Sequence, residues 1–146
     1  MADDFKQRLH AAHARRMKDT EEKRAVAAAA QQAVALQTAG ELQALDALEP
    51  AVRGRMEAAA EVDPKRYSVR IENKNPKRHA CTLSEPTGPG RAMELTVDLD
   101  REARNLSVNF SNLQSSKNLV PWTKADKFAL TTLEQLLEEF VGGGLR

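Results

Sequence analysis

The pattern of hydrophobic and polar positions changes its period near Pro64. Over residues 1–62 the apolar positions recur every three or four residues, which is typical of an amphipathic helix. Beyond Pro64 they alternate with polar residues, which is typical of half-buried strands. We therefore predict an α+β protein with a helical arm over residues 1–62 and a ββββα domain over residues 63–146.

The helical arm carries two groups of apolar positions. The first group is interrupted by the highly charged residues 13–24, and consists of Phe5, Leu9, Ala12, Val26, Ala30, Ala33 and Val34. The second group forms the cleanest stripe in the chain and consists of Leu42, Leu45, Leu48, Val52 and Met56. Gly40 and Pro50 are the two breakers, so the arm is either one bent helix or a helical hairpin.

The second half of the chain predicts a sheet and a covering helix. Four alternating segments lie between Tyr67 and Ser111, and we expect Tyr67 to face inward. Their short connections, rich in Gly, Pro and Asn, favour a four-stranded antiparallel meander. Residues 123–126 resemble a capping box, and the apolar positions that follow predict a C-terminal helix over one sheet face. Trp122 is expected in a loop, where it either closes the end of the core or anchors a partner.

Composition sets the broad class of the protein. The chain has 146 residues, of which 41% are hydrophobic and 29% charged, as expected for one domain with or without a helical arm. The start, MADDFKQRLH, does not resemble a secretory signal, and no apolar run is long enough to span a bilayer. The single cysteine, Cys81, has no partner for an internal disulfide. We expect a cytoplasmic protein.

No residue pattern predicts an enzyme. His79 and Cys81 project to one face of a strand, but that face is aliphatic, whereas a nucleophilic cysteine needs an exposed electropositive site. His10 and His13 are only two ligands, fewer than the three or four that zinc takes, so we expect no metal. The glycines match no phosphate-binding loop and no dinucleotide fingerprint, so we expect no cofactor and no catalysis.

The distribution of charge points to one candidate surface. The net charge of +1 excludes a uniformly basic coat, yet residues 65–91 hold seven basic residues against two acidic ones. These candidate phosphate contacts are Lys65, Arg66, Arg70, Lys74, Lys77, Arg78 and Arg91. The other interpretation is a solvated basic edge that resists pairing with another sheet.

Two functional hypotheses follow. The first is a non-catalytic binding or assembly protein that self-associates through its helices, most simply as a two-fold dimer of coiled-coil type. It rests on the stripe Leu42–Met56, which one covering helix leaves without a cover, and on the small-residue stripe Val26–Leu36. The contact is placed at Leu42–Met56. The alternative is that this stripe folds onto its own sheet, which makes a monomer with a charged helix projecting from it. The second hypothesis is a nucleic-acid-binding regulator that uses the basic hairpin 65–91.

Overall fold

One helix accounts for the whole N-terminal region. The computed structural model describes residues 2–145, and α1 runs from Ala2 to Glu61. Two compact units divide the chain, Met1–Ala39 and Gly40–Arg146, so the boundary falls inside α1. Pro50 lies within the helix, where it removes one backbone hydrogen bond, but its neighbours Leu48 and Val52 are buried. Packing of these neighbours offsets that loss. Because α1 is one continuous helix, the hairpin alternative is wrong.

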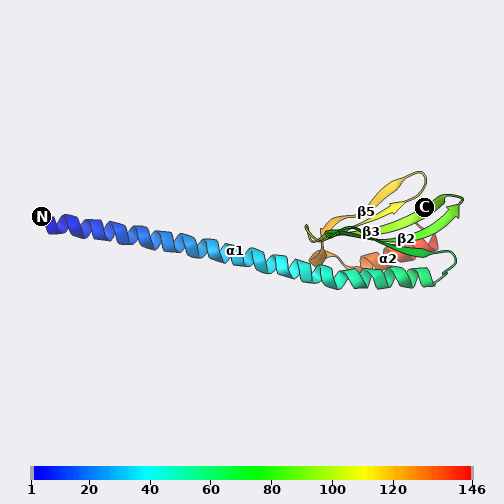
Figure 1. Ribbon diagram of the computed structural model, residues 1–146, viewed down its shortest axis with the longest axis horizontal. Coiled ribbons are helices and arrows are strands. Elements are labelled where there is room, and N and C mark those ends of the chain that lie inside the picture. The colour runs from blue at the N-terminus through cyan, green and yellow to red at the C-terminus, as the bar shows by residue number, and fades with distance from the viewer. Residues whose placement is uncertain (1, 146) are drawn as a thin grey trace. The chain divides into compact units, whose positions relative to one another are not determined.

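The strands form an antiparallel meander, as predicted, but there are five of them. Their order in the sheet follows the chain, β1-β2-β3-β4-β5 (Figure 1). Their bounds are Ser68–Asn75 for β1, Arg78–Gly88 for β2, Arg91–Asp100 for β3, Asn105–Ser111 for β4 and Ser116–Lys124 for β5. The prediction of α+β architecture is confirmed, and the prediction of four strands is wrong.

The fifth strand has no alternating pattern to reveal it. Its sequence, SKNLVPWTK, contains Pro121, and its pairing with β4 is irregular in two places. A proline is tolerated there because β5 pairs on one side only and lies at the edge of the sheet. The predicted capping box is also wrong: Thr123 belongs to β5, and its hydroxyl donates to the Pro121 carbonyl at 2.7 Å.

The C-terminal helix begins later than the sequence pattern indicated. A short 3-10 turn, η1 (Ala125–Lys127), precedes α2 (Leu130–Gly142). The helix ends where Gly143 takes a left-handed conformation, with φ of 80°, and its N–H reaches the carbonyls of Glu139 and Phe140. Glycine adopts that conformation without the steric penalty of a side chain.

The core lies between the sheet and two helices. Figure 1 shows the second half of α1 and α2 along the same face of the sheet. Across that face, Leu83, Leu95 and Phe110 are register neighbours on β2, β3 and β4. Tyr67 faces inward as predicted, with its ring 6.2 Å from that of Phe140. The helices contribute Leu45, Leu48, Val52 and Met56 from α1, and Leu133, Leu137 and Phe140 from α2.

The apolar stripe of α1 is therefore covered by its own chain. Leu45, Leu48, Val52 and Met56 are all buried, with exposed fractions between 0 and 7%, and Leu42 is partly buried. The prediction that this stripe is the self-association surface is wrong, because the stripe packs on its own sheet. The physical reason is the width of the sheet: five strands present more aliphatic surface than α2 covers alone. The monomeric state that went with this alternative stays a prediction.

Candidate functional site

The basic hairpin is surrounded by acidic side chains. Arg70 lies 2.6 Å from Glu72 and 3.7 Å from Glu94, measured between nitrogen and oxygen. Three further pairs follow the same pattern, namely Lys74–Asp98 at 3.6 Å, Lys77–Glu102 at 3.4 Å and Arg78–Asp100 at 3.8 Å. Arg66 donates to the buried Glu85 at 2.6 Å, which raises the pKa of its guanidinium. Five of the seven candidate phosphate contacts are thus paired with carboxylates.

The excess of positive charge in residues 65–91 is largely balanced at the surface by acidic residues from elsewhere in the chain. Neighbouring strand β3 supplies Glu94, Asp98 and Asp100, which stand beside the basic residues of β1 and β2. Lys65 and Arg91 make no ion pair with any residue that the structure describes. An approaching phosphate would compete with the carboxylates, so the surface offers less attraction than seven free cations.

The sheet face opposite the helices is polar, and several of its side chains hydrogen-bond one another, although Asn105 Oδ1 is buried without a partner among the described residues. Thr82 and Thr96 share a hydrogen bond of 3.1 Å between their hydroxyls, and the Asn118 side chain donates to that of Asn109 at 2.8 Å. Trp122 is 46% exposed and lies in β5, so its predicted place in a loop that closes the core is wrong. Its ring stacks under the Arg78 guanidinium at 5.5 Å. A lone aromatic already covered in this way is not the row of rings that single-strand binders use.

His79 and Cys81 lie on the helix-covered face, as predicted. His79 Nδ1 is 3.0 Å from a Glu49 carboxylate oxygen on α1. Cys81 is 5% exposed, and burial raises the pKa of its thiol to about 11. At neutral pH the sulfur stays protonated, which removes the thiolate that nucleophilic catalysis requires.

Metal binding finds no support in the described part of the chain. His10 and His13 are exposed on α1. Among residues 2–145 no three His, Cys, Asp or Glu side chains are grouped closely enough to hold an ion.

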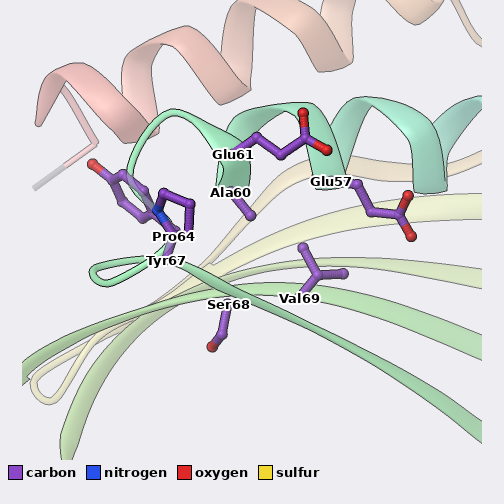
Figure 2. Close-up of a pocket in the computed structure, with 7 residues that line it drawn as sticks. All are labelled: Glu57, Ala60, Glu61, Pro64, Tyr67, Ser68 and Val69. Atoms are coloured by element: carbon purple, nitrogen blue, oxygen red, sulfur yellow. The ribbon is translucent and has the colours of Figure 1, made fainter.

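Two hollows occur beside the end of α1. The first, of about 270 Å³, lies between α1 and β1; Figure 2 shows Ala60 and Val69 directed into it while Ser68 points away. The second is an apolar groove of about 470 Å³ between α1 and α2, crossed by the Arg55–Glu134 ion pair at 2.9 Å. Neither gathers the convergent polar groups that fix a small ligand.

The first unit of the chain has no core at all. From residue 3 to residue 39 every side chain of α1 is exposed, apart from the partly exposed Thr20 and Thr38. Large apolar side chains share this exposure, at 46 to 70%: Phe5, Leu9, Met17, Val26, Val34 and Leu36. The interactions recorded within the helix are local, such as the Asp19–Lys23 ion pair at 3.8 Å.

Three of these exposed positions, Phe5, Leu9 and Val26, fall on one seven-residue repeat, whereas Met17, Val34 and Leu36 lie off it. Phe5, Leu9 and Ala12 recur 21 residues later, or three heptads, as Val26, Ala30 and Ala33. Between them the same positions hold three charged residues, Arg16, Asp19 and Lys23. We name this set the heptad seam. The apolar pattern alone hides this repeat, because the charged residues 13–24 interrupt its apolar members although its register continues through them.

Comparisons with known proteins find no relative of the chain. No protein family, curated protein or solved structure matches it. Within the described residues, no helix has the length and apolar character to cross a membrane.

Proposed function

We propose that the protein is a non-catalytic assembly protein that self-associates through residues 3–39 of α1. The observation that carries this proposal is the heptad seam, whose apolar members are exposed along a helix with no core. Apolar residues at heptad spacing favour helix–helix pairing, and here they lie on both sides of the charged seam positions 16, 19 and 23. A lone helix gains most of its stability in proteins by packing one face against a neighbour.

The energetics favour a second copy as that neighbour. Fully burying a Phe, Leu or Val side chain stabilises by roughly 1.5–3 kcal/mol. Each of Phe5, Leu9 and Val26 is exposed in the single chain and would be covered in both copies of a dimer. That gain offsets an entropic cost of association of about 4–15 kcal/mol. Residues 40–146 have a hydrophobic core of their own, so this unit does not need to take part in the contact between the two helices.

The nucleic-acid hypothesis is the weaker alternative. Its basic residues are mostly paired with carboxylates, and its sheet face offers one aromatic ring, Trp122, which already contacts Arg78. It stays a prediction, and a salt-titrated binding assay tests it below.

The test is the molar mass of the full chain in solution. We expect a dimer by sedimentation equilibrium at tens of micromolar. Changing Leu9→Lys and Val26→Lys together places charge in the heptad seam and should weaken association at least about a hundredfold. The matched control is Ala14→Lys with Ala28→Lys, which adds the same charge at positions outside the seam. This control should remain a dimer.

Two results would contradict the proposal. A wild-type chain that is a monomer throughout this concentration range has no self-association to explain. A dimer that the seam variant and the control variant weaken equally is held together by some other surface.

A further inference from the structure

We infer that two copies of residues 3–39 pair antiparallel, about a two-fold axis that passes between Met17 and Lys18. This inference rests on the proposed function and adds the direction and register of the contact. It is carried by the charges inside the heptad seam and by the sizes of its apolar members. A two-fold axis makes the contact self-complementary, as in most homodimers.

A parallel pair in register is disfavoured by three layers of like charge. In that arrangement each seam position faces its own copy, so Arg16 meets the partner's Arg16 and Lys23 meets the partner's Lys23. Asp19 would likewise meet the partner's Asp19. Like charges brought together in a desolvated seam disfavour that arrangement strongly.

The antiparallel pair converts these repulsions into attractions. Antiparallel packing sets the two kinds of seam position against each other, and residue numbers that add to 35 then face one another. Arg16 faces the partner's Asp19, and the two-fold axis repeats this pair on its other side. In the antiparallel register displaced by one heptad, Asp19 would face the partner's Lys23 instead, but Arg16 would face the apolar Val26. A buried polar pair that fixes register is an established use of charge in coiled coils.

The same register matches the apolar members by size. Leu9 faces the partner's Val26, and the bulky Phe5 faces the partner's small Ala30. Large side chains opposite small ones fill a seam without voids. Each of these contacts occurs twice because of the two-fold axis.

The remaining seam position and its flank agree with this register. Ala12 faces the partner's Lys23, whose ammonium lies 3.8 Å from Asp19 in its own chain. With its head held there, the aliphatic stem of Lys23 is free to cover a small residue. Beside the seam, Arg15 comes next to the partner's Glu22, again opposite in charge.

The length of the overlap fits the boundary of the first unit. Residue 3 faces residue 32 of the other copy in this register, so the contact between described side chains uses residues 3–32. It therefore requires no residue of the second unit, which begins at Gly40.

A charge reversal distinguishes the two directions. Arg16→Asp should weaken the antiparallel dimer at least about tenfold, because in each copy an aspartate at position 16 would then face the partner's Asp19. Combining it with Asp19→Arg restores the pairs and should recover wild-type affinity within about threefold. The control Arg24→Asp makes the same change of charge outside the seam. In a parallel dimer Arg16→Asp replaces one like-charge layer by another and leaves affinity unchanged, which would overturn the inference.

A distance measurement gives an independent test. Spin labels are attached at Lys18→Cys or Ala28→Cys, both exposed positions, in the full chain. In the antiparallel dimer the two labels at position 18 are offset by about 2 Å along the helix axis, and those at position 28 by about 30 Å. In a parallel dimer neither pair is offset. The buried Cys81, whose pKa is about 11, reacts slowly and leaves the added cysteine as the labelled site.

The outcomes separate this inference from the proposal beneath it. A short separation at position 18 with a long one at position 28 supports the antiparallel register. Short separations at both positions, or long ones at both, overturn the register while the dimer itself stands. A chain that sediments as a monomer overturns the proposed function and this inference together.

Discussion

The two halves of α1 differ in what surrounds their apolar positions. In the second half Leu45, Leu48, Val52 and Met56 are buried in the core that the chain forms with its own sheet. In the first half the apolar members of the heptad seam are exposed, and their alternating spacing of four and three residues suits a second helix. One helix thus carries a buried apolar face in one half and an exposed one in the other.

The largest expected effect is that a substitution in the second half of α1 lowers the stability of the second unit, whereas one in the first half weakens self-association. Leu45→Ala should lower the free energy of unfolding of the second unit by about 2–5 kcal/mol, because it leaves a cavity at a fully buried site. Leu9→Ala should leave that unfolding transition unchanged and weaken self-association instead. Urea unfolding followed by the fluorescence of Trp122, the only tryptophan, measures the first effect, and sedimentation measures the second. If both changes destabilise the second unit equally, the contrast between the halves is lost.

Ion pairs should show the same contrast with a smaller effect. Glu41 is 4% exposed and accepts from Arg104 at 2.5 Å, with Lys124 at 3.7 Å. Glu41→Ala leaves these cations without their carboxylate and should cost the second unit about 2–4 kcal/mol. Asp19→Ala removes half of an exposed pair and should change the same unfolding free energy by less than about 0.5 kcal/mol. Chemical denaturation of both variants provides the comparison, and equal losses would contradict it.

The reactivity of a thiol should also differ between the buried core of the second unit and the exposed half of α1. Because burial raises the pKa of Cys81 from 9.0 to about 11, its thiolate fraction at pH 8 should be about a hundredfold below that of an ordinary cysteine. In an Ala28→Cys chain the added thiol, on the exposed half of α1, should react at the ordinary rate. Timed alkylation followed by mass spectrometry compares the two in one molecule. Similar rates at the two sites would show that Cys81 is not held in a packed core.

The same thiol gives a pH dependence of stability. The folded state holds the Cys81 proton more tightly than the unfolded state, so its contribution is complete below pH 9 and is lost as pH rises through about 11. Unfolding free energies measured across that range should fall less steeply in a Cys81→Ala chain than in the wild type. Parallel curves for the two proteins would contradict the raised pKa.

The smallest effect is expected at the basic hairpin. We expect no retention of single-stranded oligonucleotides by the wild type at about 50 mM salt, where even non-specific phosphate contacts are strong. Reversing Lys74, Lys77 and Arg78 to Glu should then change nothing. Retention by the wild type that this variant abolishes, with a steep fall as salt rises, would favour the nucleic-acid hypothesis over the assembly proposal. The control reverses three basic residues of α1 outside the heptad seam to Glu, namely Lys6, Lys18 and Arg24.

The sequence alone determined the class of every segment except β5. Helical and strand periods are local properties, so the α+β class, the order of the elements and the meander were predictable from neighbouring residues. The inward placement of Tyr67, and of Cys81 on the covered face, followed from the same alternation. The strand β5 escaped because its side chains do not alternate, and a strand at the edge needs little more than backbone pairing.

Only the tertiary structure decided what each surface meets. The stripe Leu45–Met56 has the same appearance whether it contacts its own sheet or another chain, because periodicity records a buried face and not its partner. The hairpin 65–91 is basic in sequence, but its charge is largely balanced by β3, whose acids come close only when the strands pair. Burial and Coulomb attraction act through space, between residues that the chain brings together from a distance. Pairing and packing, more than local pattern, therefore set which residues remain for function.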